Sequence, residues 1–166
     1  MLRKLELKDA SLMYQTISDE SVTKYMNISG KDNSIERCEN FIRSSWDDLD
    51  NVHFAITDED DSWVGTISLK HIDRDVNQAE YAIVTSGQVH GKGFAFKATQ
   101  ELLDYAFNVL KLNRVYLNVL TTNARANKFY LKCGFVLEGT FRESINVKGQ
   151  INDLNWYSMI RKDYEK

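Results

Sequence analysis

The chain has 166 residues, of which 43% are hydrophobic and 27% are charged. Both this length and this composition are typical of a globular domain with its own hydrophobic core. Its formal net charge of −3 argues against non-specific binding to nucleic acid, which requires a basic surface. No stretch approaches the ~20 apolar residues of a membrane span, and the N-terminus lacks the apolar core of a signal peptide, so we expect a cytoplasmic, single-domain protein over residues 1–166 without membrane or nucleic-acid partners.

Cysteine and histidine are few and scattered. Cys38 and Cys133 could pair, but a disulfide is not expected in a chain that is not exported. His53, His71 and His90 show none of the spacings with which proteins hold a metal. We therefore expect no disulfide and no metal site.

In the first half of the chain, the hydrophobic periodicity alternates between the spacings of strands and helices. Ser34 can cap the second helix, and the acidic segment 58–61 suits the turn of a hairpin. The predicted elements are a strand over 2–7, a helix over 8–19, a polar loop over 20–33, a helix over 34–49, and strands over 52–58, 62–72 and 78–85.

The second half begins with the longest predicted helix, which follows a glycine-containing loop. We expect this helix to bury Ala95, Ala98, Leu102, Ala106 and Val109. The remaining elements are a strand over 113–120, a helix over 123–134 ended by Gly134, and two strands over 135–160 joined around Lys148–Gly149. The order β α α β β β α β α β β predicts an α/β fold with a mixed sheet and helices packed on it.

The loop before the longest helix suggests phosphate binding. A Walker-type loop needs Ser or Thr after its lysine, but Gly93 follows Lys92, and a Rossmann fingerprint from Gly91 would need glycine at Phe96. The first N–H groups of a helix are unpaired and carry partial positive charge, so a diphosphate could still bind there, with small residues such as Ala95 leaving room. The alternative is that the glycines only make a tight turn.

A second motif lies on the last predicted helix. Asn123 can cap this helix, and Ala126, Phe129, Tyr130 and Cys133 share one of its faces. Taken alone, Tyr130 could be a core residue whose hydroxyl bonds a backbone carbonyl. Cys133, without an evident partner histidine, fits a core residue better than a nucleophile.

Together the two motifs resemble the GNAT superfamily of acetyltransferases. In that family the pattern Gln/Arg-x-x-Gly-x-Gly/Ala binds the diphosphate of acetyl-coenzyme A, and Gln88, Gly91 and Gly93 match it. The downstream pattern Asn-x-x-Ala-x-x-x-Tyr-x-x-x-Gly-Phe is matched by Asn123, Ala126, Tyr130, Gly134 and Phe135. The order of elements also matches over nearly the whole chain. The resemblance therefore implies a mixed, mostly antiparallel central sheet with helices on both faces.

The chain is similar in particular to the RimJ/RimL-like branch, whose signature near the end is matched by Gly139, Arg142, Glu143, Gly149 and Asp153. This similarity implies a protein N-terminal α-amine as the acceptor. The segment GKGFA also resembles the loop of spermidine acetyltransferases, so the alternative is a small amine: a polyamine, an amino sugar or an aminoglycoside. A module that binds acyl-coenzyme A without turnover is a third hypothesis, although a pure binder needs no phenol at the sulfur.

The resemblance implies direct transfer of an acetyl group from acetyl-coenzyme A to an amine. Amides around Val84 and Thr85 could hold the thioester carbonyl, and whether His90 faces the anion or solvent stays open. The residues implied in coenzyme binding are Val84, Thr85, Gln88, Val89, His90, Gly91, Lys92, Gly93, Phe94, Ala95 and Asn123.

Two residues are candidates for proton transfer. The acceptor amine must lose a proton before it attacks, and Glu80, on the strand that enters the loop, is the candidate base. The alternative is that Glu80 lies on a solvated sheet face or pairs with a lysine. A phenol with a pKa near ~10 can protonate a departing thiolate whose thiol has a pKa near ~8.5, so Tyr130 is the candidate acid.

The resemblance also places the acceptor cleft between the first two helices, their loop and the last hairpin. Acidic residues of these segments could receive a cationic amine, although exposed acids usually only face solvent. The last hairpin could offer a sheet edge for a homodimer. The acidic residues concerned are Asp19, Glu20, Asp47, Asp48, Glu143 and Asp153.

Overall fold

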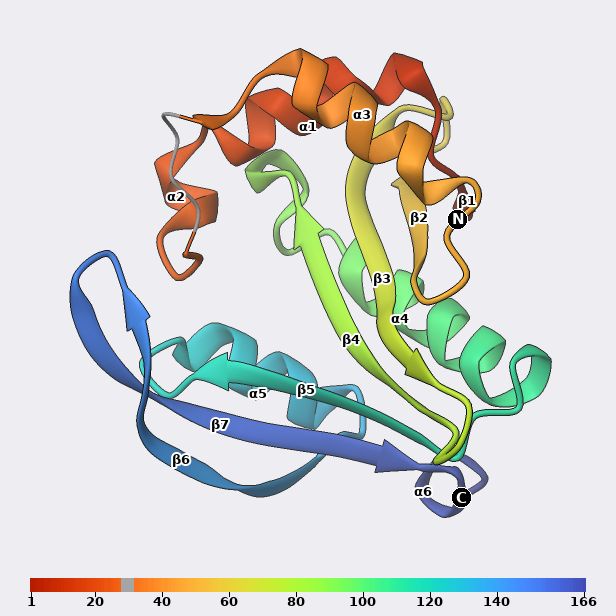
Figure 1. Cartoon of the computed structure of the whole chain (residues 1–166), viewed down its shortest axis with the longest axis vertical. Coiled ribbons are helices and arrows are strands. Elements are labelled where there is room, and N and C mark those ends of the chain that lie inside the picture. The colour runs from red at the N-terminus through yellow and green to blue at the C-terminus, as the bar shows by residue number, and fades with distance from the viewer. Residues whose placement is uncertain (28–31) are drawn as a thin grey trace.

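A computed structural model describes residues 1–27 and 32–166 (Figure 1). Seven strands form one sheet in the order β1-β2-β3-β4-β5-β7-β6, and neighbours are antiparallel except for the parallel pair β4–β5. The expected mixed, mostly antiparallel sheet is therefore confirmed. The strands are β1 (Leu2–Lys4), β2 (Val52–Thr57), β3 (Trp63–Asp73), β4 (Gln78–Thr85), β5 (Arg114–Leu120), β6 (Val136–Val147) and β7 (Gln150–Ile160).

Helices cover both faces of this sheet, as expected. On one face, α4 and α5 enclose the larger core, in which Leu102 and Phe107 pack with Leu117 of β5. On the other face, α1 and α3 enclose a smaller core around Met13 and Ile42. The helices are α1 (Ala10–Ile17), α2 (Glu20–Thr23), α3 (Ile35–Ser45), α4 (Phe94–Asp104), α5 (Ala124–Lys132) and α6 (Arg161–Tyr164), with the short helical turns η1 (Leu7–Asp9), η3 (Gly87–Val89) and η4 (Tyr105–Val109).

Several local signals act as the sequence predicts. The Ser34 hydroxyl caps α3 by accepting from the Arg37 N–H at 3.1 Å. Gly134, at φ 97°, follows the end of α5 in the left-handed conformation that suits glycine. Lys148 and Gly149 both have positive φ, which is the geometry of a tight turn between twisted strands, and they join β6 to β7.

Two predictions about these elements are wrong. The polar loop over 20–33 contains the short helix α2, because the Asp19 carboxylate caps it by accepting from the Ser21 N–H at 2.9 Å. Val109 is not buried but 62% exposed. The π-helical turn η4 adds a residue to the last turn after α4, so Phe107 takes the buried position instead.

No helix within the described ranges combines the length and the apolar character needed to cross a membrane.

Candidate active site

The site begins where β4 and β5 diverge in the middle of the sheet. The two strands pair only from Gln78 opposite Arg114 to Glu80 opposite Tyr116, and beyond this point they separate as the V seen in Figure 1. A cleft of about 850 Å³ occupies the opening. Its wall includes α5 and the start of α4 at one end, and α2 and the β6–β7 hairpin at the other. The split sheet thus allows two ligands to approach one point from different sides.

Peptide groups of β4 face this opening. The Ser86 N–H donates to the Val64 carbonyl at 2.8 Å, and in an antiparallel pair alternate residues point the same way. The N–H of Val84 is therefore directed toward β3, whereas the N–H of Thr85 is directed toward the cleft. Both residues line the cleft, but only Thr85 has the geometry to donate to an oxygen there. Of the two predicted oxyanion amides, Thr85 is the better candidate.

The start of α4 offers unpaired backbone N–H groups to an anion, and we call this group of amides the mouth of α4. Gly91 and Gly93 have φ of 78° and 85°, and the Lys97 N–H makes the first α4 bond, to the Gly93 carbonyl at 3.1 Å. Within the described residues, the N–H groups of Phe94, Ala95 and Phe96 find no backbone acceptor. A Cβ at either glycine would meet nothing within 4 Å, so neither position is crowded by neighbouring atoms. The mouth therefore fits a diphosphate.

His90 connects this loop to α5. Its Nδ1 lies 3.0 Å from Nη1 of Arg125, and both residues line the cleft. Burial, and then the charge of Arg125, lower the pKa of His90, so the neutral ring can accept from the guanidinium. His90 thus lines the cleft and contacts the first turn of α5. Arg125 stands at a free position of the family pattern, and the sequence offered no signal for it.

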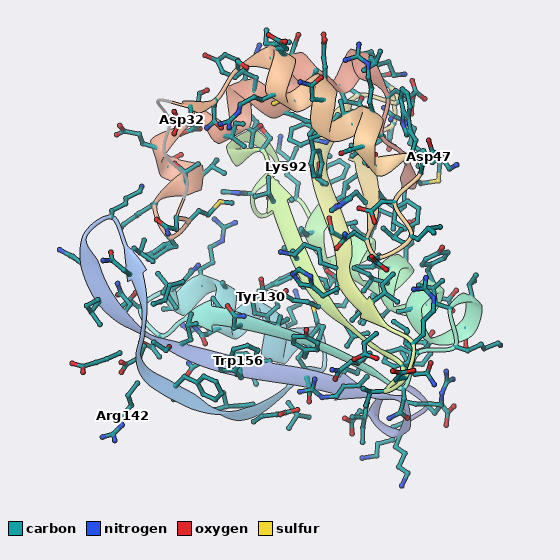
Figure 2. The ribbon with its side chains drawn as sticks, in the orientation of Figure 1. Asp32, Asp47, Lys92, Tyr130, Arg142 and Trp156 are labelled. Atoms are coloured by element: carbon teal, nitrogen blue, oxygen red, sulfur yellow. The ribbon has the colours of Figure 1, made fainter. Side chains whose placement is uncertain are left out.

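The other predicted side chains of the loop lie beside the cleft. Gln88 lines a smaller cavity of about 280 Å³ against α1, and Val89 borders both spaces. Lys92 and Phe94 do not line the cleft, and Figure 2 shows Lys92 on the upper arm of the V. The mouth is therefore made mainly by the backbone.

Tyr130 lies on the lower arm of the V and lines the cleft (Figure 2). Aromatic rings surround it, with Tyr81 at 5.8 Å and Tyr157 at 6.1 Å between ring centroids. Burial, with a smaller effect of Cys133, raises the pKa of Tyr130 to about 12. Among the described residues its hydroxyl has no hydrogen-bond partner. The phenol is therefore a protonated donor that remains available to a ligand.

A set of amides fixes the helix that carries Tyr130. Asn123 caps α5, as predicted, and lines the cleft. One turn later, the Asn127 amide donates to the Leu120 carbonyl at 3.0 Å, while its oxygen accepts from the Tyr157 hydroxyl at 2.7 Å and from Asn155 at 2.9 Å. These bonds tie α5 to β5 and β7. Sequence reasoning missed Asn127, although an asparagine on the inner face of a helix signals such a contact.

Glu80 lies at the closed end of the V, where β4 and β5 are still paired. Its side chain is 21% exposed, and its carboxylate is 3.6 Å from Nε2 of His71. It does not line the cleft that contains Tyr130. The structure thus separates the two predicted catalytic residues.

The end of the cleft at α2 and the β6–β7 hairpin, which we call the acceptor end after the expectation above, has an apolar lining that the sequence did not reveal. The hairpin and α2 meet there although they are far apart in the chain, and the Lys148 ammonium donates to the Thr23 carbonyl at 3.2 Å. The apolar side chains of these two segments in the lining are Val22, Tyr25, Met26, Ile145, Val147 and Leu154.

The six acidic residues expected to receive the amine do not line the cleft. Asp19 caps α2, and Asp48 accepts from the N–H groups of Asp50 and Asn51. Asp19 and Asp48 thus shape the local backbone, which is a common use of aspartate. Part of the expected loop, residues 28–31, lies outside the described residues.

The signature near the end of the chain forms a β-bulge. Phe141 pairs with Leu154 and Ile145 with Asn152, so three residues face Asp153 alone. The Asp153 carboxylate accepts from the Glu143 N–H at 2.7 Å and holds this bulge. Arg142 points away from the body of the molecule in Figure 2. The signature therefore bends β6 and does not supply side chains to the cleft.

Comparison with known proteins agrees with this geometry. Residues 1–136 match the family model described as acetyltransferase (GNAT) domain. The chain is 34% identical to an uncharacterised N-acetyltransferase of Bacillus licheniformis, over 98% of this chain and 93% of that protein. It is 27% identical to a spermidine N(1)-acetyltransferase of Vibrio cholerae, over 98% of this chain and 94% of that protein.

A solved structure shows the same architecture. It is a spermidine N-acetyltransferase from Vibrio cholerae in complex with CoA and spermine, with a TM-score of 0.90, 26% identity, and coverage of 100% of this chain and 98% of that one. The split sheet, the unpaired N–H groups at the start of α4 and the tyrosine on α5 thus occur in a fold shared with enzymes of acetyl transfer. The chain belongs to the GNAT family of acetyltransferases and is an N-acetyltransferase.

Proposed function

We propose that the chain transfers the acetyl group of acetyl-coenzyme A directly to a primary amine, and that this amine is the α-amine of a peptide N-terminus. The observation that carries the proposal is the cleft itself, which joins the N–H mouth of α4 to Tyr130 and continues to an apolar acceptor end. The similarity of the terminal signature to the RimJ/RimL-like branch supports a peptide acceptor.

The residues of the cleft have separate roles in this proposal. The amides at the start of α4 hold the diphosphate, and the Thr85 N–H stabilises the oxygen of the tetrahedral intermediate. The amine nitrogen bonds to the carbonyl carbon, and the carbon–sulfur bond breaks. Tyr130 gives its proton to the departing thiolate, and Glu80 takes the proton lost by the ammonium through water. Holding both reactants in one cleft contributes much of the remaining rate.

A second candidate acceptor is a polyamine. The specific observation in its favour is the similarity to the Vibrio cholerae spermidine N-acetyltransferase bound to CoA and spermine, which extends over the whole chain. The donor half of the reaction is the same for both candidates, so they differ only in what the acceptor end accommodates.

The experiment measures release of free thiol from acetyl-coenzyme A with N-terminal peptides, polyamines and amino sugars, and with no amine as the blank. We expect release above the blank with peptides that expose an α-amine. Release with polyamines only would replace the peptide by the second candidate. No release with any amine would leave a module that binds acyl-coenzyme A without turnover.

A further inference from the structure

Apolar side chains gather at the acceptor end of the cleft. Leu120, Val147 and Leu154 form a separate hydrophobic cluster there, each less than 10% exposed, and Ile145 packs against it. Across the opening, Met26 presents another apolar side chain from the segment after α2. A ligand group that enters this space exchanges water for apolar surroundings. Such an exchange is unfavourable for a charged group that has no partner of opposite charge.

Two lysines fix positive charge beside this end of the cleft. The Lys148 ammonium is held at the Thr23 carbonyl at 3.2 Å, where the hairpin turn meets α2. The Lys24 ammonium lies 5.2 Å from the ring centroid of Tyr25, which itself lines the cleft. The face of Tyr25 is thus already occupied by a cation, and an incoming ammonium would be repelled there.

Two of the nearby acids, Asp19 and Asp153, are engaged by local hydrogen bonds. Asp19 accepts from the N–H and hydroxyl of Ser21, and Asp153 accepts from the N–H of Glu143. Apart from Ser21, the side chains that line this end are apolar, aromatic or amide groups, and the two lysines lie beside them.

We infer that the acceptor carries one ammonium group on an apolar body, and that amines with a second positive charge are poor substrates. This inference rests on the proposed function and narrows its acceptor class. The amine that reacts loses its proton on the way to Thr85 and Tyr130, so its desolvation costs little free energy. A second ammonium would remain charged, lie against the apolar wall, and be repelled by Lys24 and Lys148.

The test compares two amines of equal length, hexylamine and hexamethylenediamine, which differ by the second amino group. Thiol release is measured with the full chain, and kcat/KM is obtained for each. We expect hexylamine to be preferred at least about tenfold, because the distal ammonium meets both desolvation and repulsion. Peptides beginning with leucine should likewise be preferred over peptides beginning with lysine.

A charge reversal makes the test specific. Lys148→Glu should move the ratio of kcat/KM about fivefold or more toward the diamine. Lys162→Glu on α6, an exposed lysine remote from the cleft, should leave the ratio unchanged. Lys148→Gln is the variant to use if the reversal unfolds the hairpin, and it should produce a smaller shift in the same direction.

The outcomes separate this inference from the proposed function. Equal or better turnover of the diamine would overturn the inference while leaving amine acetylation intact. An unchanged ratio in both Lys148 variants would also overturn it. Thiol release with neither amine and with no peptide would instead count against the proposed function.

Discussion

The donor and acceptor ends of the cleft are built in different ways. The donor end consists of two short continuous segments, the loop into α4 and the first turns of α5, and its mouth is made of backbone amides. The acceptor end combines α2 with a hairpin turn 125 residues away, and it is made of side chains. A site that binds through backbone amides requires glycines and capping residues at fixed positions. A site that binds through side chains can change its ligand preference with each substitution.

The largest expected effect concerns Tyr130, where the two ends meet. Tyr130→Phe removes the only proton that this side chain can give to the thiolate and keeps the ring packing. We expect turnover to fall about 10²-fold or more, with coenzyme affinity nearly unchanged. Thiol release and isothermal titration measure the two quantities. Unchanged turnover would remove Tyr130 from the role of acid.

Gly93→Val tests the donor end alone. The side chain would stand on the residue directly before the amides of α4, and its φ of 85° disfavours any residue with a Cβ. We expect coenzyme affinity to fall about tenfold or more, because hydrogen bonds to a charged group are lost. Isothermal titration checks this.

The matched control for that substitution is Gly149→Val. Gly149 has nearly the same φ, 86°, and equally open surroundings, but it lies in the hairpin turn at the other end. It should cost similar stability in thermal unfolding and leave coenzyme affinity unchanged. Equal loss of affinity in both variants would mean that backbone strain, and not the mouth, is responsible.

Glu80→Gln tests whether the closed end of the V supplies the base. Since Glu80 acts through water in our proposal, we expect kcat/KM for the amine to fall only about fivefold, with the loss greatest at low pH. The control is Glu138→Gln, which removes a carboxylate bound to Arg114 on the same sheet. Identical pH profiles for Glu80→Gln and the native chain would exclude Glu80 as the base.

The smallest expected effect concerns the pH dependence of kcat, which should stay flat in the alkaline range. Burial raises the pKa of Tyr130 to about 12, and a phenol donates only below its pKa. The acid therefore remains protonated throughout the neutral and moderately alkaline range, so kcat should not decline between about pH 8 and about pH 10. A decline centred near pH 10 that disappears in Tyr130→Phe would contradict this assignment.

Local signals explain which parts of the site were predictable. The glycines before α4 and the Asn123 cap act within a few residues, so their geometry follows from their own segment. Val109 was misplaced because the π-helical turn depends on packing around Phe107. Arg125 and Asn127 were missed because their partners, His90 and Tyr157, come from other elements.

The amino-acid sequence by itself determined the order of elements, the glycine turn that opens α4 and the tyrosine on α5, because caps, glycine turns and periodicity act over short distances. Only the tertiary structure decided which peptide groups face the cleft, where Glu80 lies relative to Tyr130, and that apolar side chains line one end of the cleft with Lys24 and Lys148 beside them. These features depend on the divergence of β4 from β5 and on contacts between distant segments. No local pattern encodes such contacts, because their energy arises only when the chain has folded.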